Sequence, residues 1–234
     1  MILPFGLSPP EAAWMALALF GAAFVRGYSG FGFAALVVTS AALVTDPMLF
    51  VPVVLLADIL LTIQQARGIR AFIDWRRAIA LFAGCIIGVP VGVQALAAVG
   101  VDTGRAIISA YVLAMCGLLL LGWRFRGHVG MPGHAGVGVI SGLANGAAVG
   151  GLPVAVFFAA QPIPAATFRA TLIAYFTLLD LWTLPVMAHA GMITRDTFVV
   201  TALAMPILSL GIWLGGRHFL RTEPQNFRRF AILL

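Results

Sequence analysis

The chain has 234 residues, of which 62% are hydrophobic and only 9% are charged, and its mean hydropathy is +1.05. Soluble domains are about 45–50% apolar and about 25% charged, so this composition excludes an ordinary soluble protein and predicts an integral membrane protein. The net charge of +6 is carried by arginines alone, since the chain has no lysine. These arginines lie between apolar runs, a pattern typical of membrane topology and lipid contact, so we expect no nucleic-acid partner.

Apolar runs follow one another along the whole chain, several of them long enough for a membrane helix of about 20 residues. In the first half, the runs cover residues 11–25, 33–44, 48–66, 78–98 and 105–123. An arginine-containing connector at 124–134 leads into the second half. We therefore expect an all-α polytopic membrane protein with a single transmembrane domain over residues 1–234.

Glycine-rich segments interrupt the apolar runs once in each half. The first segment is Arg26-Gly27-Tyr28-Ser29-Gly30-Phe31-Gly32, and the second runs from Gly142 to Pro153. Glycine disfavours a continuous helix, and in lipid a broken backbone is tolerated only where protein buries it or where it lines a watery cavity. Such breaks in corresponding positions of two halves point to the substrate site of a transporter.

The second half of the sequence repeats landmarks of the first. Asp58 and Asp74 are 16 residues apart, and so are Asp180 and Asp196. Because internal repeats change the whole fold assignment, we expect two repeats, each with a glycine-broken helix or helical hairpin followed by about three spanning helices. The repeats cover about 10–123 and about 134–234.

The arginines also predict how the chain crosses the membrane, because cytoplasmic loops are rich in Lys and Arg. If residues 134–160 crossed once, the arginines from Arg217 onward would face outside. If they enter and return as a hairpin or a pair of short helices, ten arginines face the cytoplasm, and only Arg105 and Arg195 face outside. The hairpin is therefore favoured, and it gives the halves opposite orientations, which is an inverted repeat.

With its breaks and its repeat, the chain resembles the TauE/SafE family of bacterial inner-membrane permeases, often labelled sulfite exporters. The resemblance is carried by Gly27 to Gly32, Asp46-Pro47 and Gly142 to Pro153. It implies a bacterial inner-membrane location and export of sulfite or small organosulfur anions. The sequence departs from the usual run of consecutive glycines, and its final apolar run, residues 230–234, is shorter than the counterpart in the first half.

Broken helices present free backbone N–H groups and the positive end of a helix dipole, which favour an anion by about 0.3–1 kcal/mol. We therefore predict an oxyanion site near the membrane midplane. Its predicted lining is Arg26, Tyr28, Ser29, Gly30, Phe31 and Gly32 from the first half, with Asn145, Gly150 and Gly151 from the second. The alternative is that these glycines only allow helices to pack closely.

Charged residues inside predicted spans are costly and mark functional positions by default. The planar fork of Arg26 suits a sulfonate or sulfite, although an ion pair with Asp58 or snorkelling to the interface would also explain it. Asp58 and Asp180 are candidate proton-coupling residues; alternatively, each locks a helix or pairs with an arginine, Asp58 with Arg26 and Asp180 with Arg169. Other polar residues of the spans are expected mainly to join helices, with a pathway-facing role as the alternative: Thr62, Gln64, Gln65, Thr171, Tyr175 and Thr177.

These features favour a secondary transporter that works by alternating access, with one repeat rocking against the other. A Walker motif requires lysine, so direct ATP drive by this chain is excluded, and no hydrolase or metalloprotease motif is present. We expect no enzyme activity, no cofactor and no metal, and expect coupling to protons or another ion. The alternatives are a transporter or channel for another small anion such as a carboxylate, or an importer of a sulfur oxyanion. A homodimer would suit such a compact bundle.

Overall fold

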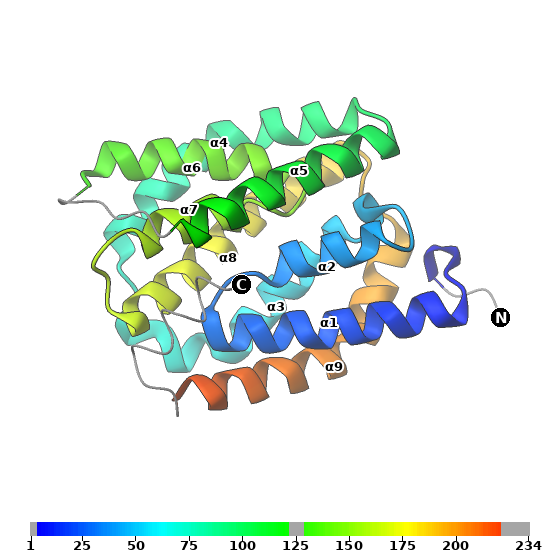
Figure 1. The fold of residues 1–234 in the computed structure, drawn as a ribbon, viewed down its shortest axis with the longest axis horizontal. Coiled ribbons are helices and arrows are strands. Elements are labelled where there is room, and N and C mark those ends of the chain that lie inside the picture. Colours follow the sequence, from blue (N-terminus) through cyan, green and yellow to red (C-terminus); the bar gives the residue numbers. More distant parts are fainter. Residues whose placement is uncertain (1–3, 122–128, 221–234) are drawn as a thin grey trace.

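The computed structural model describes residues 4–121 and 129–220, which form an all-helical bundle without strands in these ranges (Figure 1). The helices are α1 (Pro9–Ser29), α2 (Phe33–Ala42), α3 (Val51–Ile69), α4 (Trp75–Ala97), α5 (Val101–Leu120), α6 (Met131–Asn145), α7 (Gly151–Ala159), α8 (Ala165–His189) and α9 (Arg195–Leu220). Short 3₁₀ turns cover Pro4–Gly6, Pro47–Leu49 and Arg70–Phe72. The predicted all-α class is confirmed, whereas the final run at 230–234 and most of the connector lie outside the described residues.

Within the described residues, six helices are long and apolar enough to cross a membrane: α1, α3 with its flanking turns, α4, α5, α8 and α9. The other three, α2, α6 and α7, have 10, 15 and 9 residues. At about 1.5 Å per residue these are shorter than the hydrocarbon core of about 30 Å. Each of these short helices flanks a glycine break, as expected for a multi-pass membrane protein with interrupted helices.

Each glycine break reverses the chain, so that α1 folds back into α2 and α6 folds back into α7 (Figure 1). In the first break, Gly30 and Gly32 have φ angles of +85° and +88°, a left-handed conformation that L side chains rarely adopt. The Gly30 N–H donates to the Arg26 carbonyl at 2.8 Å and closes the last turn of α1. The predicted helix–break–helix arrangement is therefore present in both halves.

The first helix of each half packs against the fourth helix of the other half: α1 lies along α9, and α6 lies along α4 (Figure 1). Glycines permit this close approach. A methyl group on Gly84 of α4 would overlap the Ala135 carbonyl, and one on Gly211 of α9 would lie 2.8 Å from the Phe20 carbonyl oxygen. This reciprocal packing supports a repeat, while the inverted orientation of the halves stays a prediction.

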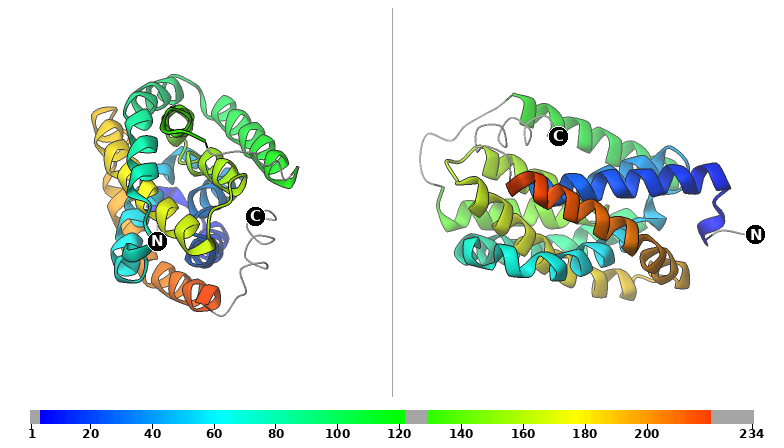
Figure 2. Two further views of the ribbon diagram at one scale, coloured as in Figure 1. Left: turned by 90° about the vertical axis from the view of Figure 1, so that its left-hand side faces the viewer. Right: turned by 90° about the horizontal axis from the view of Figure 1, so that it is seen from below.

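Helices α3 and α8 form the centre of the bundle, and α5 lies at its edge (Figure 2). In an apolar stretch of 18 residues within each helix, 56% of the residues are buried in α3 and 61% in α8, compared with 11% in α5. The links α3–α4 and α7–α8, the start of α6 and the end of α9 lie at one end of the molecule, on the left in Figure 1. We call this the arginine-rich end, because Arg67 at the end of α3, Arg70 in the turn after it, and Arg76 and Arg77 at the start of α4 lie there.

Candidate functional site

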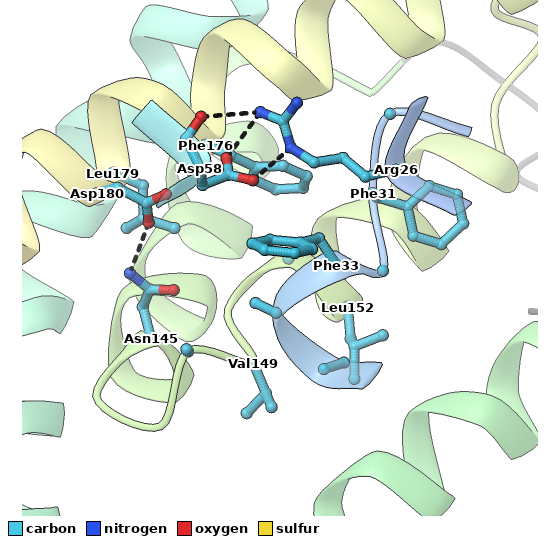
Figure 3. Close-up of a pocket in the computed structure, with 16 residues that line it drawn as sticks. Arg26, Phe31, Phe33, Asp58, Asn145, Val149, Leu152, Phe176, Leu179 and Asp180 are labelled. Atoms are coloured by element: carbon cyan, nitrogen blue, oxygen red, sulfur yellow. Dashed lines mark hydrogen bonds and ion pairs between the residues drawn. The ribbon is translucent and has the colours of Figure 1, made fainter. Parts of the chain in front are cut away.

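Both glycine breaks, together with α3 and α8, enclose one cavity (Figure 3). Its lining includes Arg26, Gly30, Phe31 and Gly32 of the first break, Asn145, Ala148, Val149 and Gly151 of the second, and the acids Asp58 and Asp180. It leaves about 30 Å³ for the centres of water-sized spheres, whereas one water needs about 10–15 Å³ on that measure. The cavity therefore has room for a small ion and not for a bulky organic anion.

The N-termini of α2 and α7 meet at this cavity, one from each half of the chain. Phe33 and Ala34 in the first turn of α2, and Gly151 and Leu152 in the first turn of α7, all line it. The N–H groups of a first turn have no intrahelical partner, and each helix N-terminus favours negative charge by about 0.3–1 kcal/mol. A β-carbon on Gly151 would lie 3.1 Å from the Phe176 ring, a tight contact that the ring would have to shift to relieve.

Arg26 forms a buried ion pair with Asp58, and only 1% of Arg26 is exposed. Its Nε donates to Asp58 Oδ1, and its Nη2 donates to Asp58 Oδ2 at 3.0 Å (Figure 3). The guanidinium also donates to Thr62 Oγ1 at 2.7 Å and to Gln65 Oε1 at 2.7 Å. The ion-pair alternative is therefore the arrangement found here, and an anion must compete with the Asp58 carboxylate for this fork.

Asp180 lies next to Asp58 at the cavity and is contacted by Asn145 of the second break (Figure 3). Asn145 Nδ2 donates to Asp180 Oδ1 at 3.4 Å and to Thr183 Oγ1 at 2.8 Å. The alternative pairing of Asp180 with Arg169 is wrong, because Arg169 donates from Nη2 to the Gly27 carbonyl at 2.7 Å. Asp180 therefore has no arginine of its own, although it is 96% buried, with 4% exposed.

Tyr28, Ser29 and Gly150 do not line the cavity, although the sequence placed them in the site. The Tyr28 ring packs against His218 of α9, with ring centroids 5.4 Å apart. The Ser29 hydroxyl accepts from the Phe31 N–H at 3.3 Å and shapes the first break. The Gly150 carbonyl accepts from the Ser141 hydroxyl at 2.6 Å. In this conformation these residues build the breaks, and their contact with substrate stays a prediction.

Apart from Phe31, the bulky apolar side chains of the lining were not predicted from the sequence. Phe33, Leu152, Phe176 and Leu179 line the cavity next to the polar groups. In a chain with 17 phenylalanines, no spacing distinguishes those at the cavity from those in the core. The one available signal was position, since Phe33 directly follows the first break and Leu152 lies within the second.

Comparisons with known proteins were made over the whole chain. The family model described as "Sulfite exporter TauE/SafE" matches residues 15–234. No curated protein and no solved structure matched the chain. The matched range includes both breaks, Asp58 and Asp180, so the whole cavity lies within the part of the chain that the family model matches.

Proposed function

Because the chain belongs to the sulfite exporter TauE/SafE family, which comprises membrane transporters and not enzymes, we propose that it is a secondary transporter for small sulfur-containing anions such as sulfite. The carrying observation is the convergence of the α2 and α7 N-termini on one cavity that contains Arg26. Helix N-termini and an arginine fork together favour an oxyanion. The small volume of the cavity favours sulfite over larger sulfonates in this conformation.

Export is the direction that we propose, across a bacterial inner membrane. A membrane potential that is negative inside favours anion efflux by about 2.3 kcal/mol per charge per 100 mV. The positive-inside rule places the arginine-rich end in the cytoplasm. On this orientation the cavity receives the anion from the cytoplasm and releases it outside, by an alternating-access cycle.

The charges around the cavity support proton coupling. Among the described lining residues, Arg26 is cationic, whereas Asp58 and Asp180 are acids. The Arg26–Asp58 pair is neutral as a unit, so an ionised Asp180 would leave a surplus negative charge beside an incoming anion. Two like charges 4 Å apart repel by about 4 kcal/mol at an effective dielectric constant of about 20. The anion therefore binds best when Asp180 carries a proton.

Asp58 has a second, separate role in this scheme. While ionised, it holds the Arg26 fork through two hydrogen bonds between side chains. Protonation of Asp58 would weaken that hold and free the guanidinium for the anion. The two acids are thus proton-coupling residues of different kinds, Asp180 by removing a repulsion and Asp58 by releasing a ligand.

A thermal-shift screen tests the proposed function directly. Purified protein in detergent is heated at constant ionic strength with sulfite, sulfate, thiosulfate, small sulfonates, carboxylates or chloride. A ligand present at 100 times its Kd stabilises the folded state by about 2.7 kcal/mol, so we expect sulfite and other small sulfur oxyanions to raise the Tm more than carboxylates or chloride do. Stabilisation by a carboxylate alone, or equal responses to all of these anions, would contradict a sulfur-anion site.

A further inference from the structure

A second hollow lies between α3 and α8 at the arginine-rich end, separate from the central cavity. It is lined by Thr62, Ala66 and Arg70 from α3 and the turn after it, Trp75 at the start of α4, and Ala174 and Thr177 of α8. We call it the access pocket. It leaves about 350 Å³ for the centres of water-sized spheres, about ten times the space in the central cavity, and it shares no lining residue with that cavity.

One face of α3 connects the central cavity with the access pocket. Asp58, Thr62 and Ala66 follow one another at intervals of four residues, so their side chains lie above one another on the same side of the helix. Asp58 lines the central cavity, whereas Thr62 and Ala66 line the access pocket. The face therefore leads from the Arg26–Asp58 pair toward Arg70.

A single polar layer separates the two hollows. Arg26 Nη2 donates to Thr62 Oγ1 at 2.7 Å, and Thr177 Oγ1 donates to the same oxygen at 2.9 Å. This layer joins α1, α3 and α8. Since Arg26 touches the central cavity and Thr62 and Thr177 touch the access pocket, a small displacement of the guanidinium would connect them.

We propose that the access pocket is an anion-binding site through which the transported anion reaches the central cavity, and that the Arg26–Thr62–Thr177 layer is the barrier between them. This inference rests on the proposed function. Arg70 is exposed at the outer part of the pocket and faces no acidic residue among the described residues that line it. Its guanidinium supplies the charge that attracts a sulfur oxyanion.

The barrier opens by an exchange of partners at Arg26. When Asp58 takes up a proton and releases the Arg26 guanidinium, an anion arriving from the access pocket replaces the Asp58 carboxylate at Arg26 and draws the guanidinium away from Thr62. Loss of the Arg26–Thr62 hydrogen bond leaves only the hydroxyl pair of Thr62 and Thr177 between the two hollows. Anion binding and opening of the layer are thereby coupled through one side chain.

Cysteine modification in membrane vesicles tests the route. Ala66→Cys is placed in a background without the chain's own cysteines, Cys85 and Cys116, and is exposed to a charged, membrane-impermeant maleimide from the arginine-rich side, because the thioether that forms is not cleaved by sulfite. The reagent is removed before sulfite is added, because sulfite itself reacts with it. We expect modification to reduce sulfite flux at least tenfold. Gly68→Cys, modified in parallel, should keep its flux, since a β-carbon on Gly68 meets no atom within 4 Å and Gly68 lies outside the pocket.

The outcomes separate this inference from the proposed function. Absence of sulfite flux in the unmodified cysteine-free protein, although that protein is folded and reconstituted, would contradict the transporter proposal itself. Normal flux that survives modification of Ala66→Cys would overturn the access pocket and leave the transporter proposal standing. Equal inhibition of the Ala66→Cys and Gly68→Cys variants would also overturn it, because the effect would not depend on the pocket.

A second comparison tests the anion site at Arg70. Arg70→Gln should raise the KM for sulfite severalfold with little change in kcat, since it removes a site occupied before the central cavity. Arg67→Gln, three residues earlier in the last turn of α3 and outside the pocket, should change the KM far less. Equal increases for both variants would show general surface attraction and would overturn the assignment to Arg70.

Discussion

Arg26 Nη2 lies 3.0 Å from Asp58 Oδ2, and this contact joins the end of α1 to the middle of α3 inside the bundle. Both residues are buried, with 1% and 6% exposed. Two charges taken out of water gain little net stability from each other, but removal of one leaves the other unpaired and costs about 3–5 kcal/mol. The pair therefore contributes little to stability as such, and it is better suited to an exchange of partners at Arg26 during transport.

A double-mutant cycle on this pair separates its structural role from its role in binding. Arg26→Gln should lower the stability in detergent by about 3–5 kcal/mol, and Arg26→Gln combined with Asp58→Asn should recover part of that loss because no charge is left unpaired. Sulfite stabilisation should be lost in both variants. The measurements are thermal unfolding with and without sulfite. Full sulfite binding in the double variant would remove Arg26 from the site.

Asp180→Asn tests whether the acid without an arginine couples anion binding to protons. In the wild-type protein, flux should fall as the pH rises, because deprotonated Asp180 repels the anion. The asparagine variant should show a weaker pH dependence, since only the effect of Asp58 is left. Thiosulfate is the appropriate substrate, since its own charge is constant over the range.

Asp74→Asn is the matched control for this pH profile. Asp74 caps α4 by accepting from the Arg77 N–H at 3.2 Å and does not line the cavity. Its replacement should leave the pH dependence unchanged. If Asp180→Asn kept the wild-type pH dependence of flux, as this control should, Asp180 would not couple protons to transport and its role would be structural.

The sequence was sufficient for the helices, for both breaks and for much of the cavity lining. Composition required membrane helices, and glycines inside apolar runs required broken ones, so Gly30, Gly32 and Gly151 were predicted at the cavity and lie there. The positive-inside count also favoured the hairpin at the second break, which α6 and α7 form. These features follow from composition, from the positions of the glycines and from the distribution of the arginines, all of which can be read directly from the sequence.

The partners of the buried charges were less predictable, because they depend on which faces of distant helices meet. Arg26 had Asp58 as an open alternative, and the structure contains that pair. Arg169 instead bonds a backbone carbonyl at Gly27, and nothing in the spacing distinguishes a carbonyl from a carboxylate as its acceptor. Tyr28 lies within the first break but turns toward α9, since adjacent residues of a helix point in different directions.

Glycine packing between α4 and α6 predicts a strong contrast between two alanine substitutions on α6. A β-carbon on Gly142 would lie 2.9 Å from the Val89 nitrogen and 3.0 Å from the Cys85 Cα, so Gly142→Ala should cost about 1–3 kcal/mol by overpacking. Gly136→Ala meets no atom within 4 Å and should be neutral or stabilising by up to about 1 kcal/mol. Thermal unfolding of both variants in detergent gives the comparison. Equal stabilities would show that the helices separate easily.

Gly30→Ala should impair transport more than Gly32→Ala, although both glycines have left-handed φ angles near +85°. The left-handed conformation costs about 1–2 kcal/mol for a residue with a β-carbon, and this cost is common to both variants. Only at Gly30 would the added methyl group also crowd the Arg169 Cγ at 2.9 Å and the Arg169 carbonyl oxygen at 3.0 Å; at Gly32 its nearest neighbour is the movable end of Val25, at 3.3 Å. Sulfite flux and Tm measured for both variants decide the point. A larger loss in Gly32→Ala would mean that the N-terminus of α2, and not the contact between the first break and α8, limits the transport cycle.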